Sequence, residues 1–456
     1  MKTHFYSTIK LCLLLLVVQG FACDKENGNS NSDNQLALKA SGKKIVDQDN
    51  NEVLLRGVNL GQWLLMEGFM SGSNGNMTQL DMKVKLHNSG VTEEEVEIMF
   101  EKWRSNFITK SDIEFIASRG FNCIRLPLHY ELFLTSEQRA LRTKVAYSST
   151  NDKSSAYELY KENLNTWVNQ KTLAVDENLD GYKIIDSLLA WCNEKNIYII
   201  LDMHAVPGTA GYNSPITDQV FSGKDFFADV RNQKALIAIW ENIAKRYKNE
   251  NLIAMYDLIN EPHGLNDQEM GILFRVKNEI VNSFRSMGNN NLIIIQGTEF
   301  GNQYKLNNGT NSLFPSDFDN KENLVYSVHR YRLPNSQTEK NPWGQQNHVA
   351  YLADAIQFQN THNVPLFVGE TGLDNDYERL KGNFDALKSL GIGWTLWSLK
   401  YHTDDGSKRS PIDISGNNPW DDINQWKDGT LFNNIRIENC IINTEPKYWQ
   451  AVSTLN

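Results

Sequence analysis

Short runs of apolar, largely β-branched residues alternate along the chain with longer stretches whose apolar positions recur every three or four residues. The short runs predict buried strands at Leu54–Leu60, Cys123–Leu128, Ile197–Asp202, Leu252–Asn260, Leu292–Gln296, Leu324–Val328, Leu366–Glu370 and Trp394–Trp397. The longer stretches predict amphipathic helices, among them Ser111–Arg119, Tyr182–Lys195, Lys234–Tyr247 and Asp267–Ser286. Apolar strands separated by helices indicate a parallel sheet covered on both faces. Eight such strands favour an α/β fold with a single closed (β/α)8 TIM barrel.

Two segments, Glu131–Asp180 and Asp404–Asn434, are longer than ordinary connections between elements. Both follow the C-terminal end of a predicted strand, so we expect them to form long loops around the mouth of the barrel. Lys43–Val53, with a polar turn in its middle, predicts a hairpin that caps the opposite end. No repeat or second domain boundary is apparent, so residues 43–456 are predicted to form one domain.

The N-terminus has the pattern of an export signal. Lys2 and Lys10 precede an apolar run, Leu11–Val18, which is too short to span a bilayer. Small residues before Cys23 resemble the cleavage box of bacterial lipoproteins, which predicts a signal peptide at 1–22 and a lipid anchor on Cys23. The alternative is ordinary cleavage that leaves a secreted protein. Residues 23–42 are polar and predict a flexible tether. The expected location is therefore the cell envelope, with the membrane as a partner through the lipid.

Charge and cysteine spacing exclude several classes of protein. The formal net charge is −10, which argues against a nucleic-acid partner because phosphate binding needs a basic surface. Cys123 and Cys192 lie inside apolar segments and predict buried thiols, and no spacing indicates a zinc site. A monomer is expected.

Polar residues gather where the predicted strands end. They are Arg125 and His129 on the second strand, Asp202 and His204 on the third, Asn260 and Glu261 on the fourth, His329 and Tyr331 on the sixth, Glu370 on the seventh and Trp397 on the eighth. Buried charged residues are costly unless they are paired, so packing alone does not explain this pattern. The C-terminal ends of barrel strands are where active sites are built.

Glu261 and Glu370 end strands that lie on opposite sides of such a barrel. Their carboxyl groups could lie about 5–5.5 Å apart, the separation found in retaining glycosidases. One carboxyl must stay protonated to give a proton to the leaving oxygen, while the other must be ionised to attack carbon. Arg125 could keep the nucleophile ionised, and His329 and Tyr331 could orient the two carboxyl groups by hydrogen bonding.

Several short motifs occur in one order along the chain. They are Arg56-Gly57-Val58-Asn59, Gly120 to Pro127, Leu201-Asp202-Met203-His204, Asn260-Glu261-Pro262, His329-Arg330-Tyr331, Gly369-Glu370 and Trp397-Ser398. Together they resemble glycoside hydrolase family 5, the cellulase family of retaining β-glycosidases, over nearly all of Lys43–Trp449. The resemblance implies that Glu261 is the acid/base, that Glu370 is the nucleophile and that Asn260 holds the 2-hydroxyl of the sugar in the −1 subsite. It also implies site roles for Arg125, His204, His329 and Tyr331, a sugar platform at Trp397, and no metal or organic cofactor.

Within that family, the segment Arg56–Glu67 is most similar to the exo-β-1,3-glucanase branch of fungi. This likeness implies that Glu67 reaches the −1 sugar and helps to close the pocket, and that Tyr212 forms an aromatic clamp for the +1 sugar. His129 is a further candidate for substrate binding. Glu131–Asp180 and the sequence after Gly264 depart from the branch, so the expectation of a β-1,3-glucan substrate is weaker than that of the mechanism.

Three other functions stay open on the sequence alone. An endo-β-1,4-glucanase or mannanase of the same family would keep the chemistry and would need an open cleft. A surface glycan-binding lipoprotein would use the barrel without catalysis, although both glutamates and their polar neighbours are present. A metal-dependent barrel hydrolase would lose its activity in chelator.

Overall fold

The computed structural model of the chain describes residues 37–71, 77–149, 151–211, 216, 223–331, 345–402, 409–414 and 422–452. The predicted export signal, the anchor at Cys23 and the clamp at Tyr212 lie outside these residues. Gln35–Asn456 form one compact unit. Within the described residues, none of the helices combines the length and the apolar character needed to cross a membrane.

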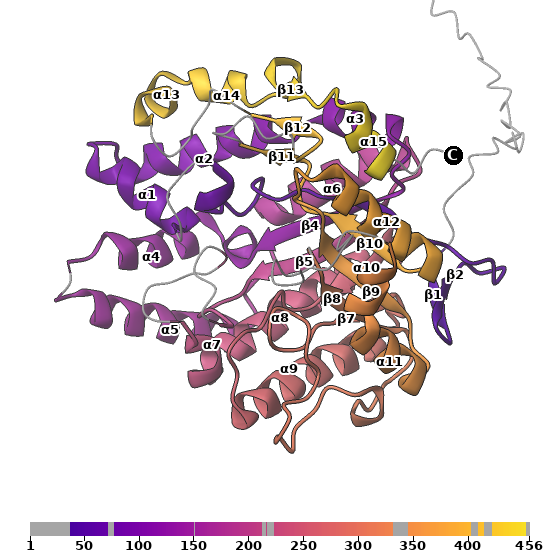
Figure 1. Cartoon of the computed structure of the whole chain (residues 1–456). Coiled ribbons are helices and arrows are strands. Elements are labelled where there is room, and N and C mark those ends of the chain that lie inside the picture. The colour runs from indigo at the N-terminus through magenta and orange to yellow at the C-terminus, as the bar shows by residue number, and fades with distance from the viewer. Residues whose placement is uncertain are drawn as a thin grey trace, which may run out of the picture. The chain divides into compact units, whose positions relative to one another are not determined.

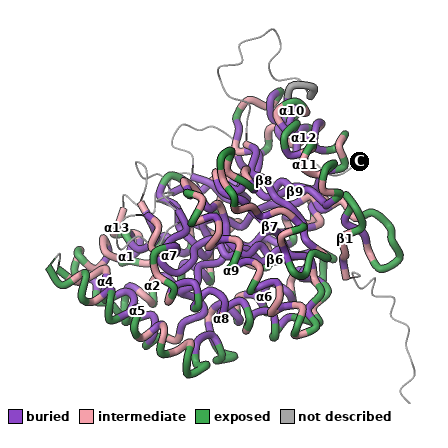
Figure 2. The backbone as a smooth tube through the Cα atoms, turned by 90° about the horizontal axis from the view of Figure 1, so that it is seen from below, coloured by how far each residue is buried: buried purple, intermediate pink, exposed green. Residues whose placement is uncertain are grey.

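Eight parallel strands close into a barrel, as the sequence predicts (Figure 1). The strands are β3 (Arg56–Asn59), β4 (Cys123–His129), β5 (Tyr198–Ala205), β6 (Ile253–Asp257), β7 (Leu292–Ile295), β8 (Leu324–His329), β9 (Leu366–Thr371) and β10 (Gly393–Leu396). Neighbours along the chain pair with one another, and β10 pairs with β3 to complete the ring. Every residue of these strands is buried except Arg56, which is half-buried, because helices cover the outer face and side chains fill the interior (Figure 2).

Helices connect most of the strands. The helices that come last before a barrel strand are α3 (Lys110–Ser118), α6 (Asp180–Asn193), α8 (Val230–Tyr247), α9 (Asp267–Ser286), α11 (Ala353–His362) and α12 (Tyr377–Leu390). The remaining helices of six or more residues are α1 (Gln79–Asn88), α2 (Glu93–Phe107), α4 (Ser136–Tyr147), α5 (Lys153–Asn169), α10 (Gln345–Tyr351), α13 (Ile423–Asp428) and α15 (Pro446–Val452). Between β7 and β8 the connection is irregular, with one short 3-10 turn at Pro315–Asp317.

Alternate residues of each strand face opposite sides, which decides where the polar residues lie. Cys123 and Ile200 belong to the cluster inside the barrel, whereas their neighbours Ile124 and Ile199 pack with the outer helices. Arg125 continues the inward row of Cys123, and Asp202 continues that of Ile200. The lower barrel is therefore apolar and the upper barrel is polar.

A small antiparallel hairpin, β1 (Lys39–Ser41) and β2 (Lys44–Val46), packs against the lower end of the barrel. Val46 pairs with Glu52 across the predicted turn, as the sequence indicates for residues 43–53. The predicted tether at 23–42 extends too far, however. Leu38 is buried with the inner cluster and residues 39–41 pair with β2, because the barrel floor buries more apolar surface than residues 43–53 supply.

The segment Glu131–Asp180 is a helical insertion rather than a long irregular loop. It contains the antiparallel helices α4 and α5, which lie side by side (Figure 1). Arg142 of α4 donates to Glu131 at 2.5 Å, and Lys83 of α1 lies 3.3 Å from the same carboxylate. Burial alone would raise the pKa of Glu131, but Lys83 and Arg142 hold it well below its usual value.

Replacing Glu131 by alanine should destabilise the fold by about 3–5 kcal/mol, because Lys83 and Arg142 would stay buried without their shared carboxylate. Thermal unfolding measures this loss. The matched control is Glu162→Ala on the exposed face of α5, which should change stability by less than about 0.5 kcal/mol. Equal melting temperatures for the two variants would contradict this role of Glu131.

Candidate active site

Side chains from six of the strands and from the segments that follow them meet at the C-terminal end of the barrel. They surround a pocket of about 570 Å³. Its described lining includes seven of the residues that the sequence analysis selected, namely Glu67, His204, Glu261, His329, Tyr331, Glu370 and Trp397. The parallel strands place these groups together, because all of their C-terminal ends lie at one edge of the barrel.

Glu370, at the end of β9, is held by donors on both carboxylate oxygens. Arg125 donates from Nη1 to Oε1 at 2.8 Å, and the hydroxyl of Tyr331 donates to Oε2. The carboxylate is 4% exposed, so it is shielded from bulk water yet lines the pocket. Arg125 and Tyr331 thus fix both oxygens of Glu370 beside the pocket, where a nucleophile must be positioned.

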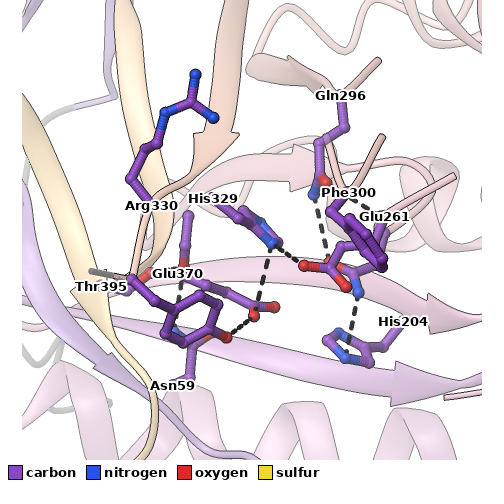
Figure 3. Close-up of polar contacts among 12 residues, drawn as sticks. Asn59, His204, Glu261, Gln296, Phe300, His329, Arg330, Glu370 and Thr395 are labelled. Atoms are coloured by element: carbon purple, nitrogen blue, oxygen red, sulfur yellow. Dashed lines mark hydrogen bonds and ion pairs between the residues drawn. The ribbon is translucent and has the colours of Figure 1, made fainter. Parts of the chain in front are cut away.

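Glu261 follows β6 and lies against His329. Nδ1 of His329 is 2.5 Å from Glu261 Oε1 and 3.5 Å from Glu370 Oε2, so this ring stands between the two carboxyl groups (Figure 3). Burial lowers the pKa of His329 to about 4, and the ring is neutral above that pH. Nδ1 of His329 and Oε1 of Glu261 are therefore close enough to form one hydrogen bond, whose donor is set by the tautomer of the ring.

Arg125 lies fully buried beneath the site and joins several of its parts. Its guanidinium lies 2.9 Å from Asp257, 3.1 Å from Asp202 and 2.7 Å from the side-chain oxygen of Asn260. Burial by itself would lower the pKa of Arg125, but the surrounding carboxylates raise it above its usual value. The guanidinium thus carries a permanent charge that holds Glu370 and Asn260 in fixed positions.

His204 and Trp397 form the wall of the pocket next to Asn260. Their rings stack with centroids 5.3 Å apart, and Asn260 Nδ2 lies 3.2 Å from His204 Nε2. The other ring nitrogen of His204 contacts Asp202 at 2.6 Å, which fixes the orientation of the imidazole. Burial lowers the pKa of His204 to about 4, so the ring acts as a neutral hydrogen-bonding group.

Glu67 supplies a third carboxyl group to the pocket. Among the described residues its Oε1 is buried without a hydrogen-bond partner, while Gln62 holds its backbone at both the N–H and the carbonyl. Burial, together with the charges of Glu370 and Glu261, raises the pKa of Glu67 well above its usual value. A neutral carboxyl in this position can both donate to and accept from a sugar hydroxyl.

His129 does not join the site. Its ring stacks on Tyr130, with centroids 5.2 Å apart, and lies near the charges of Glu131 and Arg142. His129 instead accepts a hydrogen bond from the backbone N–H of Glu131, and it is absent from the described pocket lining. The insertion 131–180 also contributes no described residue to that lining, whereas the segment after β10 contributes Arg409.

Several residues of the site were not selected from the sequence. Asp257 and Asn59 lie beneath the carboxylates, Gln296 contacts Glu261, and Phe69, Phe300, Tyr351 and Leu373 line the outer part of the pocket. The sequence contains a signal for Asp257 and Gln296, because each is a polar residue within or directly after an apolar strand. The sequence offered no signal for Phe300 and Leu373, which lie in irregular connections, or for Tyr351, which ends the short helix α10.

Glu261, His329 and Glu370 also offer three ligand atoms that all lie within 4.8 Å of one another, which is close enough to hold a divalent cation. The same distance puts oxygens of the two carboxyl groups near the separation of a retaining pair. Arg125 already supplies a positive charge at 2.8 Å from Glu370, and a metal ion there would be repelled by it. The donor set therefore fits an acid and a nucleophile better than a metal centre.

Paired glutamates that face one another over a buried arginine are the arrangement that retaining glycoside hydrolysis requires. The family model described as cellulase, glycosyl hydrolase family 5, matches residues 80–403. The chain belongs to this family, as its motifs indicate.

Curated relatives share only part of their length with the chain. A protein named β-xylosidase from Phanerodontia chrysosporium is 28% identical over 301 residues, which cover 65% of this chain and 52% of that protein. Endoglucanase C from Acetivibrio thermocellus is 28% identical over 225 residues, which cover 49% of this chain and 50% of that protein. The chain thus spans about half the length of these two relatives.

Among solved structures, the crystal structure of rutinosidase from Aspergillus niger superimposes with a TM-score of 0.54. The two chains are 18% identical, and the match covers 83% of this chain and 98% of that one. At this identity the likeness shows the barrel fold alone.

Proposed function

We propose that the protein is a retaining β-glycosidase that hydrolyses β-glucans by double displacement. The observation that carries this proposal is the pairing of Glu261 with Glu370 across the pocket, within 4.8 Å and with different partners. Glu370 is held by Arg125 and Tyr331, and Glu261 is hydrogen-bonded to His329. Membership of the family supports the same function, as do the relatives named β-xylosidase and endoglucanase C.

In the first step, Glu370 attacks the anomeric carbon while Glu261 gives its proton to the departing oxygen. Breaking the glycosidic bond leaves a glycosyl ester on Glu370. In the second step, Glu261 removes a proton from water, which attacks the same carbon and releases the sugar with its original configuration. Asn260 and His204 are placed to hold hydroxyls of the −1 sugar, and Trp397 provides the face on which that sugar lies.

We further propose exo action on β-1,3-glucan as the finer specificity. Glu67 supports it, because a buried carboxyl with an unused oxygen next to both catalytic groups can bind a hydroxyl of a chain-terminal sugar. An endo-β-1,4-glucanase is the second candidate, since one relative carries the name endoglucanase. That activity would require the pocket to continue as a cleft on both sides of the −1 sugar.

Replacing Glu67 by alanine should lower kcat/KM on β-1,3-linked oligosaccharides by about 10- to 100-fold, the effect of losing a hydrogen bond worth about 1.5–3 kcal/mol. Since the pKa of Glu67 is raised, the neutral amide of Glu67→Gln is the matched control and should retain most of this binding. Equal kcat/KM for wild type and Glu67→Ala would show that Glu67 does not contribute to sugar binding.

Time-resolved product analysis on laminarin, carboxymethyl-cellulose, mixed-linkage glucan, mannan and xylan tests the proposed function. The expected result is glucose alone from laminarin at early times, unchanged in the presence of chelator. If mixed oligosaccharides are released from a β-1,4 polymer, the proposed mechanism still holds but the assignment of exo action on β-1,3-glucan is wrong. No hydrolysis of any of these polymers would favour the glycan-binding alternative.

A further inference from the structure

Gln296 is a buried amide that contacts the backbone of the proposed acid/base residue. It directly follows β7, and its Oε1 accepts a hydrogen bond from the backbone N–H of Glu261 at 3.0 Å (Figure 3). Its Nε2 donates to Asp257 Oδ2 at 2.6 Å and to Asn260 Oδ1 at 3.4 Å. One side chain therefore contacts three residues at or just after the end of β6. Gln296 itself does not line the described pocket.

The orientation of the Gln296 amide follows from its partners. A backbone N–H can only donate, so the oxygen must face Glu261, and the amino group is then directed at Asp257. Lys277 of α9 fixes the position of the residue from outside the barrel, since its Nζ donates to the Gln296 carbonyl at 2.8 Å. The amide is thus held at both ends and has one arrangement available.

The backbone of Glu261 needs such a partner. Its φ is +46°, in the left-handed region that residues other than glycine rarely occupy. This conformation persists only when the surroundings fix it, and the hydrogen bond from its N–H to Gln296 is placed to do so. Gly301 makes room for the contact, because a Cβ on this residue would lie 2.7 Å from Gln296 Oε1.

The same amide links the backbone of Glu261 to the carboxylate of Glu370. Asp257 Oδ2 accepts from Gln296 and also from Arg125 Nη2 at 2.9 Å. Arg125 then donates from Nη1 to Glu370 at 2.8 Å. A continuous chain of buried hydrogen bonds therefore runs from the backbone of Glu261 to the carboxylate of Glu370.

We propose that Gln296 is a positioning residue that sets the backbone of Glu261 and thereby aims its carboxyl group at the glycosidic oxygen. This inference rests on the proposed retaining mechanism. Arg125 still holds Asn260 and Asp257 when Gln296 is lost, whereas the backbone N–H of Glu261 loses its acceptor, so the loss should weaken the two proton transfers in which Glu261 takes part. Sugar binding in the −1 subsite, which depends on other side chains, should change little.

Gln296→Met removes all three side-chain hydrogen bonds while keeping a side chain of similar length. On β-linked oligosaccharides kcat should fall by about 100-fold, as expected for a catalytic group displaced by about 1 Å, with KM close to the wild-type value. On 2,4-dinitrophenyl β-glucoside, whose leaving group needs no proton, formation of the glycosyl enzyme should persist and the second step should limit the rate. Azide should then accelerate turnover, because it attacks the anomeric carbon, displaces the Glu370 carboxylate and yields β-glucosyl azide.

Gln296→Glu provides a second, pH-dependent readout. In its neutral form the new carboxyl can still donate to Asp257 and accept from Glu261, and once ionised it faces Asp257 with like charge. Activity on oligosaccharides should therefore be highest at acid pH and should fall as the new carboxyl ionises, at a pH where wild type stays active. A residue with a merely structural role would not shift the profile in this way.

Gln233→Met on α8 is the matched control, because Gln233 is also buried and its Nε2 donates to Phe226 at 2.8 Å, yet it does not line the described pocket. It should lower the melting temperature without azide-dependent turnover or a change in the pH profile. Wild-type kcat in Gln296→Met, or a loss that azide does not rescue while Glu261→Ala is rescued, would overturn the role of Gln296. Failure of azide to rescue Glu261→Ala would instead overturn the proposed function, and the inference with it.

Discussion

Glu370→Ala is expected to lower kcat on β-linked oligosaccharides by about 10⁴- to 10⁶-fold, the range seen when a nucleophile or its partner base is removed from another hydrolase. The reason is that no other group is placed to form the ester intermediate. Tyr331 and Arg125 would lose their common acceptor but would remain in place. Steady-state hydrolysis with purified, folded variant measures the loss.

External nucleophiles give this variant a distinctive signature. With 2,4-dinitrophenyl β-glucoside, azide can occupy the space left by the carboxylate and attack the anomeric carbon directly, which yields α-glucosyl azide. The matched control is Glu299→Ala, since Glu299 is an exposed acid on the segment after β7, and it should retain nearly all activity. Activity of Glu370→Ala near the wild-type level would exclude Glu370 as the nucleophile.

Glu261→Ala is expected to produce a loss that depends on the leaving group. Oligosaccharides depart as poor leaving groups that need a proton, so their kcat should fall by about 10²- to 10⁴-fold, the usual contribution of general acid–base catalysis. An aryl glycoside with an acidic leaving group needs no such help in the first step. Its glycosyl enzyme should therefore form and accumulate.

The product formed with azide distinguishes this variant from Glu370→Ala. Azide should attack the accumulated glycosyl enzyme and give β-glucosyl azide, the anomer opposite to that expected for Glu370→Ala. Pre-steady-state release of dinitrophenol should show a burst. Equal losses on both substrate types, without a burst, would contradict the assignment of Glu261 as the acid/base.

The barrel could be predicted because its strands are buried on both faces and their apolar runs stand out from the helical stretches. All eight predicted runs overlap strands of the closed barrel. The irregular connections and the insertion lack this pattern of apolar runs, so their structure could not be predicted in the same way. The β7–β8 connection contains no α-helix, and the insertion after β4 forms two helices, of which α4 contributes Arg142 to a buried ion pair with Glu131.

Much of the site could also be anticipated, since a barrel brings all strand ends to one edge. His204, Asn260, His329 and Glu370 lie together as their positions suggested. His129 was selected by the same reasoning and does not line the described pocket, because its ring instead accepts from the backbone of Glu131 and stacks on Tyr130. The sequence predicts Gln296 as the last residue of a strand. Its contact with Glu261 depends on the left-handed backbone conformation of Glu261, which the sequence does not reveal.

The central claim is that Glu370 forms a covalent bond to the sugar. Incubating the enzyme with 2,4-dinitrophenyl 2-deoxy-2-fluoro-β-glucoside should trap that ester, because the fluorine slows its hydrolysis more than its formation. Peptide mapping by mass spectrometry should then place one fluoroglucosyl group on Glu370. A label on Glu261 or another residue, or turnover of substrate with inversion of configuration and no label, would contradict the account.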